Sequence, residues 1–224
     1  MNNQLKNGFW VLCLVSIFLS GAYFISKYKK SKKPQLPYYG KGITINPNEF
    51  QSEVEPYIHK IGKFEFINQH NEPITEQDFK DCIYIANYIF TTCPGICKDM
   101  TRELRKIYTH FKSDSSIKIL SHTSKPEEDS VSVLYDFSKS QGVSEQNKWH
   151  FVTGNIDSLY QMALSSYLIV NPEDEKTNGT FVHTERVALI DQRLHIRGFY
   201  DATDPKETGR LIKDIELLKK ELQQ

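Results

Sequence analysis

The stretch CIYIANYIFTTCPGICKDM, residues 82–100, joins an apolar run to two cysteines and then to a helical pattern. Its first nine residues are rich in β-branched and aromatic side chains without alternation, which predicts a strand buried on both faces. Beyond Cys97, a helix is expected over residues 98–111, because apolar residues recur there at helical spacing: Met100, Leu104, Ile107 and Phe111. The stretch therefore predicts a strand, a tight turn holding Cys93 and Cys97, and a helix.

Strands and helices are expected to alternate along the rest of the chain. The patterns predict strands at 63–68, 117–122, 149–154, 181–191 and 193–201, and helices at 130–140, 156–168 and 205–222. This order predicts an α/β fold of the thioredoxin-like type, with a central mixed β-sheet flanked by helices. Loops after parallel strands meet at one edge of such a sheet, so Cys93–Cys97 and His122–Glu128 are expected at the same edge.

Composition excludes several classes of protein. The 224 residues suit one sizeable domain, and 28 basic residues balance 28 acidic ones, which leaves no electrostatic footprint for nucleic acid. Four cysteines are too few for a disulfide scaffold. Cys13 lies in an apolar segment and Cys82 begins the buried strand, where it is expected to be a small buried side chain.

The N-terminal region differs sharply from the rest. Residues 1–8 form a short leading segment, and residues 9–26 are almost wholly apolar, which predicts a transmembrane anchor at the lower length limit. A cleavable signal peptide ending at Ser20-Gly21-Ala22 is the alternative, although the apolar run continues beyond that point. Residues 27–58 are expected to be a linker, and residues 59–224 the folded domain. Lysines in KYKKSKK after the apolar segment would favour a cytoplasmic domain by the positive-inside rule, although long domains often cross regardless.

Cys93 and Cys97 can serve as a redox pair, as metal ligands, or as both. A thiol at a helix N-terminus loses its proton more readily, which makes it a nucleophile and a ligand. Pro94 and Gly95 allow a tight bend between the cysteines. Two thiolates with one imidazole suit a soft ion such as Cu(I), whereas structural zinc would require a fourth protein ligand.

These motifs resemble the Sco/SenC family of thioredoxin-fold copper-binding proteins that assist assembly of cytochrome c oxidase. The resemblance spans residues from about 61 to the C-terminal helix. It rests on Phe90-Thr91-Thr92-Cys93-Pro94-Gly95-Ile96-Cys97 and on a later His183-Thr184 followed by Leu189-Ile190-Asp191. WHFVTGNIDSLYQMALSSY is also similar to the family's segment before that histidine.

The resemblance implies that Cys93, Cys97 and His183 bind copper, as Cu(I) or Cu(II). It also implies a membrane-anchored domain outside the cytoplasm, in a bacterial periplasm or the mitochondrial intermembrane space. The implied partner is the copper-bearing subunit of cytochrome c oxidase or another copper-protein client. His122 is the runner-up ligand from its strand position, and the other five histidines are expected to be structural or solvated: His59, His70, His110, His150 and His195.

Three positions depart from the family pattern. Lys125 replaces the first acidic residue of an Asp-Pro-x-x-Asp-like element, Val182 replaces a common Asp, and Lys98 replaces a usual proline. A lost carboxylate near a metal site can alter ligand orientation and affinity.

Three functions compete. The first is a non-enzymatic copper chaperone that uses Cys93, Cys97 and His183. The second is a thiol-disulfide oxidoreductase, in which Cys93 and Cys97 are the catalytic pair and His183 is dispensable. The third, a thiol peroxidase, fits poorly with a Cys-x3-Cys motif and a distant His-Thr pair.

Overall fold

The computed structural model describes residues 15–21, 23, 34–40, 43–45, 58–143, 147–170 and 184–222. The chain divides into two units, residues 1–35 and 36–224. In the first unit, residues 15–21 are helical. The predicted anchor 9–26 lies largely outside the described residues, and no helix within the described ranges is long and apolar enough to span a membrane.

The described residues of the second unit form a nine-stranded sheet in the order β2-β1-β9-β8-β5-β6-β7-β3-β4. The strands are β1 (Tyr38–Gly40), β2 (Ile43–Ile45), β3 (Glu65–Asn68), β4 (Pro73–Thr75), β5 (Ile83–Ile89), β6 (Ile117–Thr123), β7 (Trp149–Thr153), β8 (Arg186–Ile190) and β9 (Ile196–Asp201). The helices are η1 (Glu76–Phe79), α2 (Ile96–His110), α3 (Val131–Ser140), α4 (Ile156–Gln161), η2 (Met162–Ser166) and α5 (Pro205–Leu222). Every expected strand and helix therefore has a counterpart.

The centre of the sheet sets the direction of the site. β5 pairs in parallel with β6, and β6 with β7, so the carboxyl ends of these three strands meet at one edge. β8 runs antiparallel to β5, with Ala86 opposite Ala188, so its first residue, Arg186, lies toward the carboxyl end of β5. The sheet is mixed, as predicted, and β5 is buried at all seven positions.

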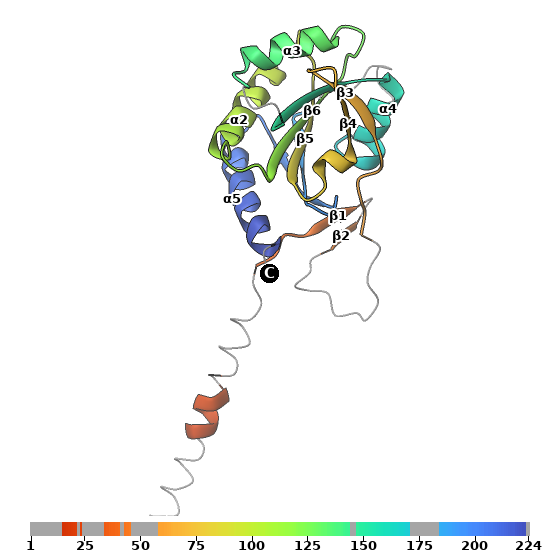
Figure 1. Ribbon diagram of the computed structural model, residues 1–224. Coiled ribbons are helices and arrows are strands. Elements are labelled where there is room, and N and C mark those ends of the chain that lie inside the picture. Colours follow the sequence, from red (N-terminus) through yellow and green to blue (C-terminus); the bar gives the residue numbers. More distant parts are fainter. Residues whose placement is uncertain are drawn as a thin grey trace, which may run out of the picture. The chain divides into compact units, whose positions relative to one another are not determined.

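Helices cover both faces of the sheet (Figure 1). One apolar cluster joins Ile85 of β5 to α2 through Leu104 and to α5 through Ile215. The other joins Tyr84 of β5 to α4 and η2 through Leu159 and Met162. Alternate residues of β5 thus feed two separate cores, which explains why its sequence is apolar on both faces apart from the buried Asn87.

The expected linker 27–58 is partly built into the domain. β1 and β2 pair in an antiparallel arrangement, and Tyr39 of β1 pairs with Ile196 of β9, so both strands extend the sheet. Leu36 is buried in the core next to them. β1 and β2 contain Tyr and Ile, which favour strands. The Pro and Gly residues around them are typical of a linker, so the sequence pattern predicted one.

Two local features have no counterpart in the expected pattern. β4 and η1 follow β3, where Thr75 caps η1 by accepting a hydrogen bond from the backbone N–H of Gln77. The expected helix 156–168 changes from α-helix to a π-helical turn at Met162.

Candidate metal centre

Cys93 and Cys97 lie at the carboxyl edge of β5, as their sequence positions predict. Three residues separate the end of β5 from Cys93, and α2 begins at Ile96, so Cys97 is in the first turn of that helix. Both are thiols with 6% and 5% of their surface exposed. The backbone N–H of Cys93 donates to the carbonyl of Phe90, which closes the turn that carries the pair.

The two thiols have different proton affinities. Burial raises the pKa of the Cys93 thiol, but hydrogen bonds to its sulfur from the Cys97 thiol and from the backbone N–H groups of Gly95 and Cys97 hold that pKa below its ordinary value. Burial, followed by the hydrogen bond donated to Cys93, raises the pKa of Cys97 to about 12. Cys93 is therefore the more acidic thiol of the pair, through the Cys97 thiol first and then through two backbone N–H groups at the start of α2.

A second loop is fastened to the cysteine loop through Asp129. The fully buried Asp129 carboxylate accepts hydrogen bonds from the backbone N–H of Thr91 at 3.2 and 3.3 Å and from its hydroxyl at 2.5 Å. It also accepts the Thr123 hydroxyl at 2.5 Å, at the end of β6. Thr92 adds a contact to Glu128 at 3.1 Å. The two predicted loops therefore meet at one edge, joined by the carboxylate at the last position of the Asp-Pro-x-x-Asp-like element.

Lys125, one of the departures from the family pattern, lies in the same loop. Its ammonium nitrogen is 4.8 Å from the centre of the Phe90 ring and 2.9 Å from the Glu128 carboxylate. Phe90 is the first residue of the Phe-Thr-Thr-Cys motif. A cation consequently stands over the residue that begins the cysteine turn.

His122, the runner-up ligand, lies on the other face of the sheet from the cysteines. Its ring stacks on Tyr88 at 4.7 Å and meets the edge of Phe66 at 5.4 Å, within the cluster packed on α4. The cysteines belong to the opposite cluster. Burial lowers the pKa of His122 to about 3, so this side chain is a neutral core histidine.

The remaining described histidines have structural or surface positions, as predicted. Burial lowers the pKa of His150 to about 4, and the ring nitrogen of His195 lies 3.4 Å from Asp191. The other three contact a carbonyl or an aromatic ring: His59, His70 and His110.

His183, the third predicted ligand, lies outside the described residues. The described chain resumes at Thr184, two residues before β8 begins. β8 starts toward the carboxyl end of β5. Thr184, which precedes β8, therefore lies at the edge of the sheet that carries the cysteines. Within the described ranges, no three side chains of His, Cys, Asp or Glu form a metal-binding group.

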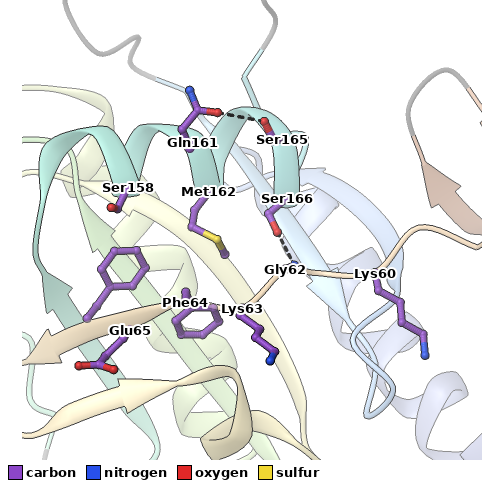
Figure 2. A pocket seen from close by; sticks show the side chains of 11 residues that line it. Lys60, Gly62, Lys63, Phe64, Glu65, Ser158, Gln161, Met162, Ser165 and Ser166 are labelled. Carbon is purple, nitrogen blue, oxygen red and sulfur yellow. Dashed lines mark hydrogen bonds between the residues drawn. The ribbon is translucent and has the colours of Figure 1, made fainter.

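A cavity that the sequence did not predict lies on the face of the sheet opposite Cys93 and Cys97. Figure 2 shows it between residues 60–66 and the α4–η2 segment. Its volume is about 620 Å³. The backbone N–H of Gly62 donates to the Ser166 hydroxyl at 2.6 Å, which ties the two sides together. Phe64 and Met162 line it, and neither cysteine does.

Comparison with known proteins identifies the family of this chain. The SCO1/SenC family model matches residues 53–219, which include both cysteines, the Asp129 loop and the strand pair β8–β9. The chain belongs to the SCO1/SenC family. The SCO1 protein homolog of Bacillus subtilis is 27% identical over 166 residues, which cover 72% of this chain and 84% of that protein.

Solved structures share the fold. BsSco, a member of the Sco family of cytochrome c oxidase assembly proteins in which a disulfide switch is identified, matches with a TM-score of 0.60 and 24% identity, over 74% of this chain and 96% of its own. Arabidopsis thaliana ScoI with copper bound matches with a TM-score of 0.56 and 22% identity, over 70% of this chain and 98% of its own. The predicted thioredoxin-like α/β fold is therefore confirmed.

Proposed function

We propose that this protein is a copper chaperone that binds copper through Cys93, Cys97 and His183 and assists assembly of the copper site of cytochrome c oxidase. Membership of the SCO1/SenC family supports this function, as do the names of its relatives, one an oxidase assembly protein and another solved with copper bound. Copper is the cargo in this account. It arrives at the protein and leaves by exchange of ligands with a client.

The pair of thiols at the start of α2 carries the proposal. Their sulfurs are close enough to share a hydrogen bond, so both can contact one ion. Thiolates favour Cu(I), which accepts low coordination numbers, and an imidazole completes a three-ligand site. The entry of Thr184 from the same edge supports His183 as that third ligand, because His183 is its immediate neighbour in the chain.

The location of the protein belongs to the same proposal. The apolar residues 9–26 would anchor the chain in a membrane, with the folded domain on the extracytoplasmic side, where the copper-bearing subunit of the oxidase would receive its metal. The length and composition of this segment support the anchor. Transfer by ligand exchange needs no covalent chemistry from the chaperone, so the proposed protein is not an enzyme.

An anaerobic titration with Cu(I) tests the ligand set. The reduced full-length protein in detergent competes with a chromophoric Cu(I) chelator, and the variants are Cys93→Ser, Cys97→Ser and His183→Ala. We expect one tightly bound equivalent in the wild type and weaker binding in all three variants. Cys82→Ser and His110→Ala are the matched controls, since these residues lie elsewhere on the domain and should leave the affinity unchanged.

Retention of full affinity in His183→Ala would contradict the three-ligand site. Failure of the reduced wild type to bind Cu(I) would contradict the chaperone function as a whole.

The unequal thiols favour a second candidate, a thiol-disulfide oxidoreductase. In that reaction the Cys93 thiolate attacks a client disulfide, forming a mixed disulfide and releasing one client thiolate. Cys97 then attacks the Cys93 sulfur, which releases the second client thiolate and leaves a Cys93–Cys97 disulfide. A lowered pKa for Cys93 and a raised one for Cys97 match an attacking thiol and a resolving thiol.

Reduction of a peptide that carries two cysteines in a disulfide distinguishes the candidates. The oxidoreductase account expects Cys93→Ser to abolish reduction and His183→Ala to retain it fully. Two results would count against this second function. One is a loss of peptide reduction in His183→Ala, and the other is a wild-type protein that does not reduce the peptide.

A further inference from the structure

A second cavity lies at the opposite end of β5 from the cysteine pair. It has a volume of about 870 Å³, and its lining includes Cys82, Lys112, Ser113, Lys118, Asn147 and Lys148. Cys82 precedes β5 and Cys93 follows it, so the seven residues of the strand separate the two places by on the order of 20 Å. Cys82 is only half-buried and lines this cavity, which corrects the expectation of a small buried apolar side chain.

Three lysines from different parts of the chain line this cavity. Lys112 follows the end of α2, Lys118 lies in β6, and Lys148 directly precedes β7. The Lys118 ammonium donates to the carbonyl of Asp78 at 2.7 Å, and the Lys148 ammonium donates to the carbonyl of Asp114. A carbonyl oxygen orients an ammonium group without neutralising it, so the bond to Asp78 positions the Lys118 ammonium and leaves its charge.

The carboxylates near the cavity balance only part of the positive charge of its lysines. The Asp114 carboxylate lies 2.6 Å from the Lys219 ammonium, which helps to lower its pKa to about 2 despite partial burial. Among the residues described, Lys112 and Lys118 form no ion pair with a carboxylate. Asp81 is another nearby carboxylate, since its charge acts on the Cys82 thiol.

We propose that this cavity binds a small polyvalent anion bearing phosphate or carboxylate groups. Ammonium groups are strongly hydrated point charges with three donors each, and they pair well with phosphate and carboxylate oxygens. Hydroxyl and amide groups at Ser113 and Asn147 supply further donors. The volume falls within the range of sites for small molecules and exceeds what a monovalent ion needs.

Cys82 makes the site measurable without copper. The charges of Lys118 and Lys148 act on its thiol, so an anion bound beside them both covers the sulfur and disfavours its thiolate. The reduced full-length protein is alkylated with neutral iodoacetamide, and mass spectrometry of the peptides gives separate rates for Cys82 and Cys93. Cys93 serves as the internal reference.

The probes are inorganic pyrophosphate and citrate, each compared with sodium chloride at equal ionic strength. We expect one or both probes to slow alkylation of Cys82 by about tenfold while the rate at Cys93 stays unchanged. Protection by pyrophosphate alone would identify a phosphate site, and protection by citrate alone would identify a carboxylate site. Protection by both would identify a site that accepts either group. Each result supports the proposal.

Lysine variants locate the anion. Lys112→Gln and Lys118→Gln should each raise the half-protecting concentration by about tenfold, the loss expected for one charge-assisted contact. Lys213→Gln, an exposed lysine on α5, is the matched control and should behave as the wild type. Protection is scored as a ratio within each variant, because removing Lys118 also changes the intrinsic reactivity of Cys82.

Equal slowing by sodium chloride, or unchanged protection in both lysine variants, would overturn the proposal. Neither result bears on the copper site, which involves other residues at the other end of β5.

Discussion

At the scale of single residues, Cys93 and Cys97 should differ in reactivity although they are equally buried. Hydrogen bonds to the Cys93 sulfur lower its pKa, whereas burial and the bond to Cys93 raise the pKa of Cys97 to about 12. We predict that at neutral pH Cys93 is alkylated more than about tenfold faster than Cys97, because the thiolate is the reactive form. Peptide mass spectrometry during alkylation measures both rates. Faster reaction at Cys97 would show that this assignment is reversed.

Asp129 is predicted to hold the cysteine turn in place. Asp129→Asn puts an amide group among three donors, the Thr91 N–H and the hydroxyls of Thr91 and Thr123. We expect the free energy of unfolding to fall by about 2–3 kcal/mol, the cost of leaving buried donors without an acceptor. Copper affinity should fall by about tenfold as the turn loosens. Chemical denaturation and chelator competition measure the two effects.

Glu128→Gln is the matched control for Asp129→Asn. Glu128 contacts Thr92 and Lys125 from an exposed position, so its loss should change stability and copper affinity little. Equal effects of the two substitutions would mean that Asp129 has no special part in the site.

At the scale of elements, the sequence predicted the central unit well and the edge of the sheet poorly. The strand from Ile83 to Ile89 and the helix that follows it have local signals, apolar runs and helical periodicity. β1 and β2 are short, and β1 and the residue Leu36 before it are held by partners about 160 residues away in the chain, which local patterns do not reveal. A weakly patterned segment can thus become a strand through distant contacts.

Arg197 is the distant contact that holds this segment. It is buried, donates to the carbonyls of Leu36 and Pro37 at 2.7 and 3.2 Å, and pairs with Asp191 and Glu221. We predict that Arg197→Met costs about 3–5 kcal/mol of unfolding free energy, since it leaves two carboxylates without their cation. Denaturant unfolding gives this cost.

Hydrogen exchange tests the local effect of Arg197→Met. The Leu36 amide donates to Glu221 at 2.6 Å, so its exchange should accelerate more than that of amides within β5. Arg193→Met, at an exposed position in the neighbouring turn, should leave both stability and exchange unchanged. A uniform acceleration across the domain would contradict a specific attachment of this segment.

At the scale of the whole molecule, burial of His122 should make the fold sensitive to acid. Its pKa falls to about 3 in the folded protein, against about 6.5 in the unfolded chain. Between these values the unfolded chain binds a proton that the folded protein does not, so stability decreases as pH falls. One such group contributes a slope of about 1.4 kcal/mol per pH unit.

His122→Phe should flatten this dependence. Phenylalanine suits the surrounding rings of Phe64, Phe66, Tyr88 and Tyr167, and it does not titrate. Urea unfolding at pH 6, 5 and 4 should show stability falling by about 1 kcal/mol per pH unit less than in the wild type. A slope equal to that of the wild type would mean that His122 takes up its proton in the folded state.

The same histidine shows where sequence reasoning about the site reached its limit. The position of His122 at the end of a strand correctly predicted that it lies near the edge of the sheet that carries the cysteines. It did not predict that the side chain lies on the opposite face of the sheet from them. The face depends on the pairing of β6 with β5, where His122 lies opposite Tyr88 and Ile89 opposite Thr123. Cys93 and Cys97 were recognisable because their turn and helix start are encoded locally, whereas Asp129 acts through partners on two other segments.

X-ray absorption at the copper edge tests the central claim most directly. The full-length protein is loaded with one equivalent of Cu(I) under anaerobic conditions, alongside His183→Ala and the control His110→Ala. The account predicts two sulfur ligands and one nitrogen ligand in the wild type and in His110→Ala, and loss of the nitrogen in His183→Ala. A site with one sulfur, or an unchanged nitrogen in His183→Ala, would contradict copper binding by Cys93, Cys97 and His183.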